Sequence, residues 1–403
     1  MKFRKVSQLV LVSALGLAVA FVLSGCLLVS IDYIFVADSA GTTAGSAGQI
    51  QTFATDAASG ALRPINQAVS SGGSTPVALT TTADNLNLYA ANQSNNALVH
   101  FTVADDGTLT QKESVTVPFV PTSIAVNKAG SFIYVVGGSN PGKIAVYPLS
   151  SGNIGGLASS LSLTVPGNPT DLLVPTGVNV LTNGSSVYVC AWDQSAYNPG
   201  NTVTSSANPG WVYGFNVGSG GGLTAAGGSP YQAGIKPTGI ASDPTNRFVY
   251  VTDYASNTLI GYTVQSTGIL NFLVNGPFKT GNQPTAVTID PRGLYLYVPN
   301  SLSNTVSGFA ITLATGTPTT VVATSGTGSL VTDTQPVATI IDPALGRFLY
   351  TANYLGNSIS GFRIDPNTGT LTATQATPYP TAAHPAAIAA VPHGNHAIQA
   401  VAP

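Results

Sequence analysis

The stretch PTAVTIDPRGLYLYVPNSLSNTVSGFAI, residues 284–311, decides the fold of this chain. It contains three apolar runs, at residues 284–289, 295–298 and 305–311, separated by the turn DPRG and by a polar loop at residues 300–304. Short runs of β-branched, aromatic and aliphatic residues between such turns predict antiparallel β-strands. No helical periodicity follows the N-terminal segment, so the sequence predicts an all-β protein.

The same pattern recurs along the chain, and each copy opens with a proline. Successive copies begin mostly about 45 to 52 residues apart, which is the repeat length of propeller blades. The opening prolines are Pro76, Pro121, Pro169, Pro237, Pro284, Pro336 and Pro385. A fourth short strand follows a Gly-x-Leu signal at residues 60–62, 107–109, 268–270 and 369–371. The sequence therefore predicts a seven-bladed β-propeller of four-stranded antiparallel blades.

The two ends of the repeat region are predicted to complete the same blade. Residues 31–37 match a second strand, whereas the copy that opens at Pro385 supplies a first strand and little more. Joining them closes the ring and leaves no free edge strand on either side of the join. We expect the propeller to span residues 31–403.

Composition limits the partners of the chain. Only 7% of its 403 residues are charged, and the formal net charge is -2. A nucleic-acid partner is not expected, because neutralising phosphates requires clusters of basic side chains. The composition suits a single all-β domain outside the cytoplasm, and we expect a monomer.

Residues 1–25 have the pattern of a bacterial lipoprotein signal peptide. Three basic residues among the first five precede an apolar run at residues 9–23, and LSGC follows at residues 23–26. We expect cleavage before Cys26, lipidation of its thiol, and a short tether over residues 26–30. An uncleaved transmembrane anchor is the alternative, because residues 27–29 extend the apolar run to roughly the length that spans a bilayer. The lipoprotein hypothesis makes the membrane a partner and places the propeller in the cell envelope, in the outer membrane or periplasm if the cell has an outer membrane.

Cys190 is the only other cysteine and stands in an apolar strand, so we expect a buried free thiol. The histidines, at positions 100, 384, 393 and 396, show no spacing with carboxylates that is typical of a zinc site. We expect no metal and no cofactor.

The repeat resembles the lactonase family of seven-bladed propellers, which includes 6-phosphogluconolactonases and carboxymuconate cyclases. The segment YVPNSLSNTVSGF, residues 297–309, carries the resemblance, which spans nearly all of the chain after Cys26. Enzymes of that family have Pro-Arg-His at the start of one first strand and Asn-Glu after the next strand. The best matching blade here has Pro284-Thr285-Ala286 and Asn300-Ser301, so all three reactive side chains are missing. The single glutamate, Glu113, falls in an outer strand, where a solvated edge charge is expected.

The residues that precede the opening prolines are expected to form a ring around one end of the central channel. They are Thr75, Val120, Asn168, Lys236, Gln283, Gln335 and His384. Lys236 and His384 are the ionisable members, and with Asp253 they are the weak catalytic candidates. The alternative is that the ring only hydrates a water-filled channel.

The loops after the second strands belong to the same end of the channel. They supply Asp38, Asn92, Asp253, Asn300 and Asn353. Asn300 and Asn353 join the candidate ligand-binding residues, together with the ring members Asn168, Lys236, Gln283, Gln335 and His384. Turn preference alone also explains asparagine and aspartate at such positions.

An insertion of about twenty residues lengthens one loop between residues 191 and 211 and holds both tryptophans. We expect it to overhang the channel, where Trp192 and Tyr197 could stack on a sugar ring or contact a partner protein. Trp211 opens a strand and is expected in the core. A loop that simply covers a wider gap between blades is the alternative.

Two functions of different classes follow from these residues. The first is a lipid-anchored propeller that binds a sugar-like ligand or an envelope protein without chemistry, which the missing Arg, His and Glu favour. The second is a lactone hydrolase, as the family resemblance implies. A purely structural envelope protein is a third possibility.

Overall fold

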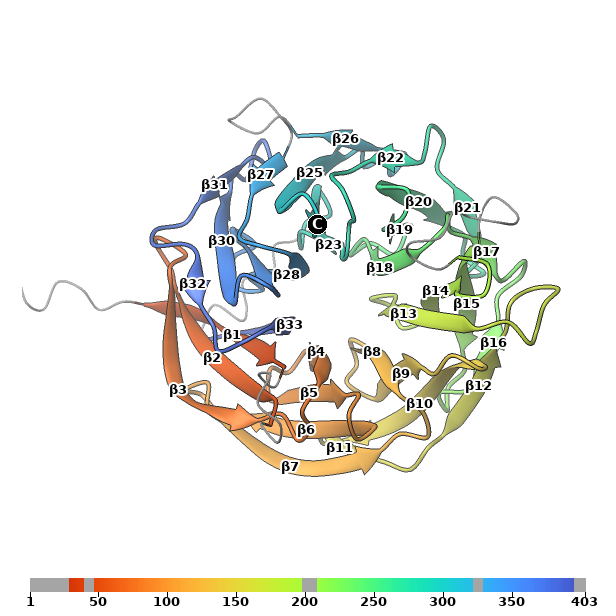
Figure 1. Cartoon of the computed structure of the whole chain (residues 1–403), viewed down its shortest axis with the longest axis horizontal. Coiled ribbons are helices and arrows are strands. Elements are labelled where there is room, and N and C mark those ends of the chain that lie inside the picture. Colours follow the sequence, from red (N-terminus) through yellow and green to blue (C-terminus); the bar gives the residue numbers. More distant parts are fainter. Residues whose placement is uncertain (1–28, 40–46, 198–208, 322–328, 395–403) are drawn as a thin grey trace, which may run out of the picture.

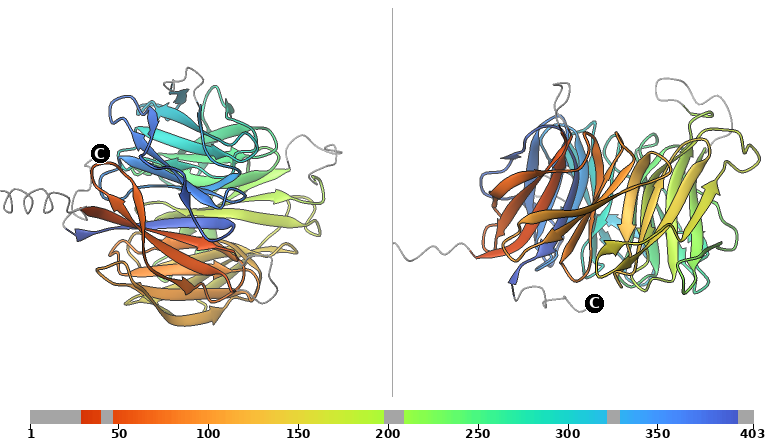
Figure 2. Two further views of the ribbon diagram at one scale, coloured as in Figure 1. Left: turned by 60° about the vertical axis from the view of Figure 1, so that its left-hand side comes forward. Right: turned by 90° about the horizontal axis from the view of Figure 1, so that it is seen from below.

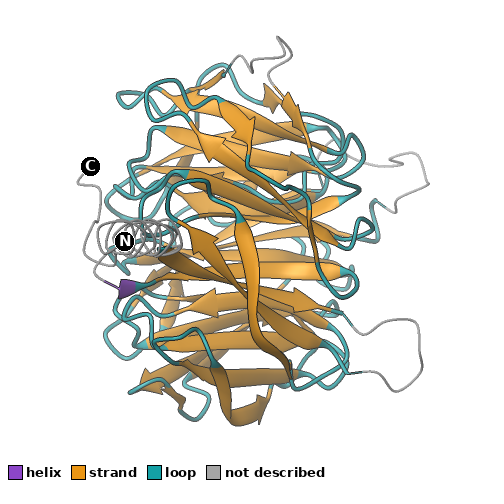
Figure 3. Ribbon diagram, turned by 90° about the vertical axis from the view of Figure 1, so that its left-hand side faces the viewer, coloured by secondary structure: helices purple, strands orange, loops and turns teal. Residues whose placement is uncertain are grey.

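The computed structural model describes residues 29–39, 47–197, 209–321 and 329–394. The strands of these residues form seven antiparallel sheets arranged in a ring, as Figure 1 shows. Seen edge-on, the strands run between two faces of the ring (Figures 2 and 3). The described ranges contain no α-helix, and none of their segments forms a helix able to cross a membrane. The predicted seven-bladed β-propeller is confirmed.

Each blade has its first strand nearest the ring axis. Blade 1 consists of β33 (Pro385–Pro392), β1 (Ser30–Asp38), β2 (Gln49–Asp56) and β3 (Leu62–Ser70), and blade 2 of β4 (Pro76–Thr81), β5 (Asn87–Asn92), β6 (Ala97–Val103) and β7 (Leu109–Thr116). Blade 3 consists of β8 (Pro121–Val126), β9 (Phe132–Gly137), β10 (Gly142–Ser150), β11 (Asn153–Ile154) and β12 (Ser159–Leu163). Blade 4 consists of β13 (Leu173–Val180), β14 (Ser186–Asp193), β15 (Gly210–Val217), β16 (Leu223–Ala225) and β17 (Tyr231–Gln232).

The remaining blades repeat this arrangement. Blade 5 consists of β18 (Pro237–Ser242), β19 (Phe248–Asp253), β20 (Thr258–Val264), β21 (Leu270–Phe272) and β22 (Phe278–Lys279). Blade 6 consists of β23 (Thr288–Ile289), β24 (Tyr295–Asn300), β25 (Thr305–Ile311), β26 (Pro318–Thr320) and β27 (Ser329–Val331). Blade 7 consists of β28 (Pro336–Ile341), β29 (Phe348–Asn353), β30 (Ser358–Ile364), β31 (Leu371–Ala373) and β32 (Tyr379–Pro380). In blades 3 to 7 the fourth strand is split into two short segments, which both pair with the third strand.

Blade 1 closes the ring with strands from distant parts of the sequence. Its innermost strand, β33, pairs antiparallel with β1, from Asp32 opposite Pro392 to Asp38 opposite Pro385. This pairing confirms the predicted closure and gives both strands a partner along their shared edge.

The opening of blade 4 differs from the prediction. Its first strand is β13, and Pro175 occupies the position of Pro121 and Pro237, with the same register irregularity just after each proline. Pro169 lies before the strand, and Asn168 is exposed in a turn closed by a bridge to Val165. Asn168 is therefore not part of the ring at the axis, and Val174 takes its place.

Buried tyrosines connect neighbouring blades. The hydroxyls of Tyr89, Tyr188, Tyr250, Tyr297 and Tyr350 donate hydrogen bonds of 2.5–2.9 Å to the carbonyls of Gly152, Gly268, Gly316, Gly369 and Gly60, respectively. Each of these glycines has a positive φ, between 70° and 82°, which favours glycine over other residues. These five tyrosines are thus both packed and hydrogen-bonded.

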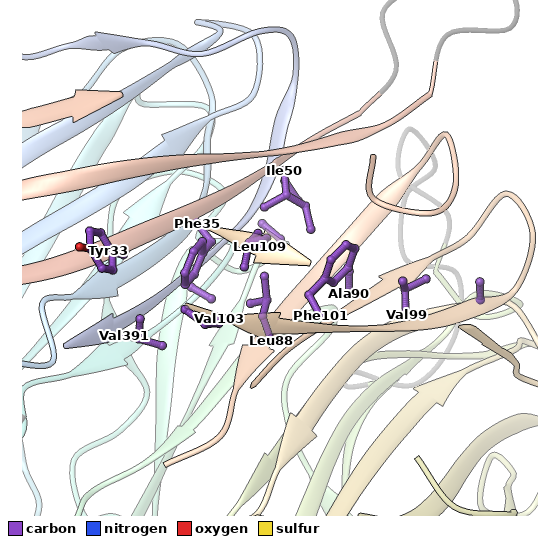
Figure 4. Packing of buried hydrophobic residues seen from close by; sticks show 14 of the residues in the cluster. Tyr33, Phe35, Ile50, Leu88, Ala90, Val99, Phe101, Val103, Leu109 and Val391 are labelled. Carbon is purple, nitrogen blue, oxygen red and sulfur yellow. The ribbon is translucent and has the colours of Figure 1, made fainter. Parts of the chain in front are cut away.

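Apolar side chains fill the space between blades. Between blades 1 and 2, for example, Phe35 and Ile50 pack with Leu88 and Phe101 (Figure 4). Cys190 is fully buried as expected, and burial raises the pKa of its thiol to about 11. Cys26 lies outside the described residues.

The ring has two faces, which we name by their residues. The mouth face holds the residues that directly precede the blade-opening prolines, including Val174, Lys236 and His384. The turn face holds the turns between first and second strands, including residues 243–247, 290–294 and 342–347. At the turn face, the buried carboxylates of Asp243 and Asp290 accept backbone N–H groups of their own turns, so these acids shape the fold.

Candidate functional site

The ring of residues on the mouth face is held by side chains of the adjoining loops. Backbone N–H groups of Gln283, Gln335 and His384 donate to the side-chain oxygens of Asn257, Asn304 and Asn357, at 2.7, 2.8 and 2.8 Å, respectively. Gln283, Gln335 and His384 have φ values of 56°, 59° and 48°, an uncommon conformation for residues other than glycine. Such backbone persists only where the surroundings fix it, so these three side chains leave the blades in set directions.

Lys236 is held between two aromatic rings. Its Nζ lies 4.4 Å from the ring centroid of Tyr254 and 5.0 Å from that of Trp192. Both distances are typical of cation–π contacts, each worth about 0.5 to 2 kcal/mol. The two aromatic residues occupy the same position in adjacent blades, since each directly follows the residue that pairs with the blade-opening proline, Ala191 opposite Pro175 and Asp253 opposite Pro237. Blades 4 and 5 together thus form a cage around one ammonium group.

The charge of Lys236 is not matched by an acid. Within the described ranges, no carboxylate lies within ion-pair distance of its Nζ. The side chain is half-buried, and this burial lowers the pKa of the amine. A partly desolvated ammonium without a counter-ion is a favourable place for an anionic group of a ligand.

Gln283 extends this cage toward blade 6. The hydroxyl of Tyr254 donates a 2.7 Å hydrogen bond to Oε1 of Gln283. The amide of Gln283 is thereby oriented next to the aromatic cage, with its own N–H groups as further donors. Lys236, Tyr254 and Gln283 form a connected polar group at the mouth face.

A second aromatic contact lies at the junction of blades 7 and 1. The imidazole of His384 lies 4.8 Å from the ring of Tyr354, measured between centroids. Tyr354 follows Asn353, as Tyr254 follows Asp253. The sequence analysis did not identify either tyrosine as a site residue. Both directly follow the aspartate or asparagine that ends a second strand, and this shared position can be recognised in the sequence.

Three of the predicted site residues make hydrogen bonds within their own blades and loops. The carboxylate of Asp253 is buried and accepts the N–H groups of Ile235 and Lys236 at 2.8 and 2.9 Å. The amides of Asn300 and Asn353 are also buried and donate to serine and threonine side chains of their own blades. These bonds use the carboxylate of Asp253 and the amide nitrogens of Asn300 and Asn353 within the fold, whereas Oδ1 of Asn300 is buried without a hydrogen-bond partner among the described residues.

Trp192 of the insertion also lies differently from the prediction. Trp192 is the last but one residue of strand β14 and is only 5% exposed, so it is a wall of the Lys236 cage and not an overhanging platform. Tyr197 packs edge-on against it, with centroids 6.0 Å apart. Trp211 is partly buried against a core cluster, as expected. Residues 198–208 of the loop lie outside the described residues.

Comparisons with known proteins identify the family. The sequence profile described as "Lactonase, 7-bladed beta-propeller" matches residues 34–171 and 223–400. The chain belongs to this lactonase family. A comparison with curated protein sequences finds no match.

Solved structures agree with the family in fold. A periplasmic gluconolactonase from Pseudomonas aeruginosa is 20% identical, with a TM-score of 0.73, covering 90% of this chain and 99% of that one. A candidate 6-phosphogluconolactonase from Bacteroides fragilis is 21% identical, with a TM-score of 0.71, covering 91% and 99%. At these identities the likeness establishes the architecture of this lactonase-family chain.

Hydroxyl groups stand where the resemblance to lactonase-family enzymes leads one to look for arginine and glutamate. Thr285 donates to the carbonyl of Pro336 at 3.1 Å, a link between blades 6 and 7. Ser301 is buried and donates to the carbonyl of Gln283 at 2.9 Å. In this lactonase-family member, the side chains at these two positions donate hydrogen bonds to backbone carbonyls.

Asp38 is the exceptional acid of the mouth face. It is fully buried at the end of β1, its carboxylate oxygens make no hydrogen bond of normal geometry within the described residues, and the nearby Thr381 hydroxyl only partly offsets the effect of burial on its pKa. Burial raises the pKa of its carboxyl to about 7. The residue beyond it, Ser39, donates its N–H to the carbonyl of His384 at 3.1 Å, so Asp38 lies on the backbone beside that histidine.

Glu113, His100 and His393 lie away from the mouth. Glu113 is in the outer strand β7, as predicted, where its carboxylate accepts the N–H of Ile154 and lies 3.5 Å from Nδ1 of His100. His393 packs on Tyr33 at the turn face, and His396 lies outside the described residues. Among the residues that the structure describes, no three His, Cys, Asp or Glu side chains converge as a metal site.

Proposed function

We propose that this lactonase-family propeller binds a small anionic sugar derivative, such as an aldonate, at the mouth face. Binding without chemistry is the favoured function, and a monomer is the expected state. The observation that carries the proposal is the half-buried Lys236, which lies between Trp192 and Tyr254 without a counter-ion.

The residues around Lys236 suit such a ligand. The ammonium would bind a carboxylate through a charge-assisted hydrogen bond, which is stronger than a neutral one. The amide of Gln283, fixed by Tyr254, would bond sugar hydroxyls. Tyr354 and His384 would supply a flat, partly apolar surface across the ring axis. Gln335 is placed by the same backbone bonding as Gln283 and completes the set.

We further propose that the chain is a lipoprotein of the cell envelope. Cys26, after the apolar run and the small residues Ser24 and Gly25, supports processing and lipidation at that position. The periplasmic source of the Pseudomonas neighbour is compatible with this address. Outside the cytoplasm we expect an unphosphorylated sugar acid as the ligand in preference to a phosphorylated one.

Calorimetric titration of the purified full-length chain in detergent tests the binding function. The probes are gluconate, glucono-δ-lactone and neutral glucose. We expect gluconate to bind tightest, and Lys236→Met to weaken it at least about tenfold, since a charged hydrogen bond contributes about 1.5 to 3 kcal/mol. Lys279→Met is the matched control, because Lys279 is an exposed lysine of strand β22, an outer strand of the same blade. Equal affinity in the wild type and Lys236→Met would place the ligand elsewhere.

Lactone hydrolysis is the second candidate, and Asp38 is the observation that favours it. A carboxyl whose pKa is raised to about 7 is suited to proton transfer near neutral pH. Hydrolysis of glucono-δ-lactone, corrected for spontaneous ring opening, tests this function. Turnover that is lost in Asp38→Asn, while gluconate still binds, would support an enzyme. If gluconate binds but glucono-δ-lactone is not hydrolysed, the proposed function is binding without chemistry.

A further inference from the structure

The first described strand fixes where the N-terminal segment joins the ring. Strand β1 starts at Ser30 on the turn face and ends at Asp38 on the mouth face, opposite Pro385. The carbonyl of Val29 accepts the N–H of Ala57 at 2.9 Å, and Ala57 belongs to the turn between β2 and β3. The N-terminal segment therefore joins the propeller at the turn face of blade 1.

The chain between Cys26 and this junction is short. Four residue steps separate Cys26 from Ser30, and fully extended chain spans at most about 3.3 to 3.6 Å per residue, or about 14 Å in all. A six-residue strand such as β19 is about 20 Å long. A lipid on Cys26 would therefore hold the turn face near the membrane, with the mouth face about a strand length farther away.

The arginines of the described ranges also lie at the turn face, where the N-terminal segment joins the propeller. All five arginines of the described ranges lie at the turn-face ends of their strands or in its turns, and they belong to blades 1, 5, 6 and 7: Arg63, Arg247, Arg292, Arg347 and Arg363. We call this set the arginine arc. Four of its members are exposed, and Arg292 is partly exposed. The described lysines nearest the mouth face are Lys143, Lys236 and Lys279.

The arginine arc meets the N-terminal junction. The guanidinium of Arg363 donates to the carbonyl of Ala58, the neighbour of the residue that binds Val29. Arg292 donates to the carbonyl of Pro366 at 3.0 Å, which ties blade 6 to blade 7, and its Nε pairs with the buried carboxylate of Asp290 at 2.9 Å, so the unpaired charge of the arc comes from its other members. Asp56 and Asp365 are the exposed or half-exposed acids of the same four blades at this face, whereas Asp84, Asp105 and Asp106 lie together in blade 2. The turn face is thus basic over one arc and acidic beside it.

We infer that the turn face, through the arginine arc, lies against anionic phospholipid headgroups and that the mouth face points away from the membrane. Arginine binds phosphate groups through its planar array of donors, and basic residues near an anionic leaflet are attracted to it. The inference rests on the proposed lipidation of Cys26. Its functional meaning is that the Lys236 cage is open to solutes and large partners while the chain is anchored.

Quenching of two matched probes in blade 7 tests this orientation. Asn367→Cys places a label in an exposed turn of the turn face, and Leu355→Cys places one at the mouth face, where Leu355 is 55% exposed. The buried Cys190 stays unlabelled under native conditions. The full-length lipidated chain is reconstituted into phosphatidylethanolamine and phosphatidylglycerol vesicles that contain a headgroup nitroxide. We expect quenching of the Asn367→Cys label several-fold above that of the Leu355→Cys label. Equal or reversed quenching would overturn the inference.

Removing two exposed arginines tests the role of the arc. Arg247→Gln with Arg347→Gln spares Arg292 and Arg363, whose guanidinium groups make the interblade bonds. We expect quenching of the Asn367→Cys label to be stronger on vesicles with phosphatidylglycerol than on neutral vesicles, and the double variant to lose this difference. Lys279→Gln, at the mouth side, should keep it. A difference that survives the double variant would exclude the arc as the contact.

Mass spectrometry of the purified chain separates the two levels of failure. If Cys26 carries a lipid and the quenching pattern is reversed, the orientation is wrong while the anchor stands. If Cys26 carries no lipid, the proposed anchor and this inference both fall. Ligand titration in detergent depends on neither, so the binding function is judged separately.

Discussion

The hydroxyl of Tyr350 donates a 2.7 Å hydrogen bond to the carbonyl of Gly60, a residue 290 positions earlier in the sequence. This bond joins blade 7 to blade 1, next to the place where the ring closes. The same tyrosine–glycine contact recurs between other pairs of adjacent blades, so the closing junction uses the same bond as the rest of the ring.

Removing this hydroxyl should loosen the closing junction. Tyr350→Phe leaves the buried carbonyl of Gly60 without this donor, which should lower the free energy of unfolding by about 1 to 3 kcal/mol. Tyr134→Phe is the control, because Tyr134 is equally buried but its hydroxyl has no partner among the described residues. Guanidinium denaturation followed by tryptophan fluorescence measures both. Equal effects of the two changes would show that the bond is not what stabilises the junction.

Glycine at position 60 should be required for two separable reasons. Its φ is +70°, and an added Cβ would lie 2.2 Å from Cδ1 of Phe348. Gly60→Ala should therefore cost about 2 to 5 kcal/mol, from the left-handed backbone and from overlap. Gly167→Ala shares the positive φ but has free space around its Cβ, so it should cost only about 1 to 2 kcal/mol. Thermal unfolding of both variants is the measurement. Because of the overlap with Phe348, Gly60→Ala should lower the unfolding temperature more than Gly167→Ala.

Stability should decline as the pH rises because of Asp32. Burial, with the nearby Asp342, raises the pKa of the Asp32 carboxyl from 3.8 to about 9. The folded state thus holds a proton that the unfolded chain releases, so this group's contribution is complete below pH 3.8 and is lost as the pH rises through about 9. The slope is at most about 1.4 kcal/mol per pH unit.

Asp32→Asn should flatten this pH dependence between pH 5 and 8, because the amide is neutral and its oxygen can still accept the N–H of Ala344. Asp38 also titrates in this range, so the difference between wild type and variant isolates Asp32. Asp365→Asn, an exposed acid whose pKa is lowered by backbone N–H groups, should change stability only at acid pH. An unchanged slope in Asp32→Asn would mean that Asp32 is ionised in the folded protein.

Ligand binding at the mouth face should be visible in tryptophan fluorescence. Trp192 contacts Lys236 directly, whereas Trp211 packs against a core cluster. Gluconate bound to the ammonium should change the emission of the wild type and of Trp211→Phe. Trp192→Phe should lose most of the change. A signal that follows Trp211 instead would move the site away from Lys236.

The repeat made the blades predictable, but it did not fix every boundary. Pro169 and Pro175 are both followed by threonine, and only the next residue separates them, since Pro175-Thr176-Gly177 matches Pro237-Thr238-Gly239. The structure explains the match, because Thr176 and Thr238 donate to the carbonyls of the next opening prolines at 2.8 Å each. The Pro-Thr-Gly pattern can be recognised as a link between blades only after the structure has shown which carbonyl the threonine hydroxyl binds.

The polar residues of the mouth were harder to assign. Asparagine and aspartate after a strand can face solvent or bond their own loop, and the same residue types suit both roles. Asn300, Asn353 and Asp253 have the second role. Tyr254 and Tyr354 were overlooked because tyrosine is also the main core residue of the repeat, and only the structure separates the two positions.

The pairing of β33 with β1 also sets an order of events during synthesis. Strand β1 emerges from the ribosome before every blade, yet its inner neighbour emerges after all of them. Until then the edge of β1 has open backbone groups, which chaperones and proteases recognise more readily than a paired edge. A chain that stops before residue 385 cannot complete blade 1. Blade 1 therefore closes only after the strands of blades 2 to 7 have been synthesised.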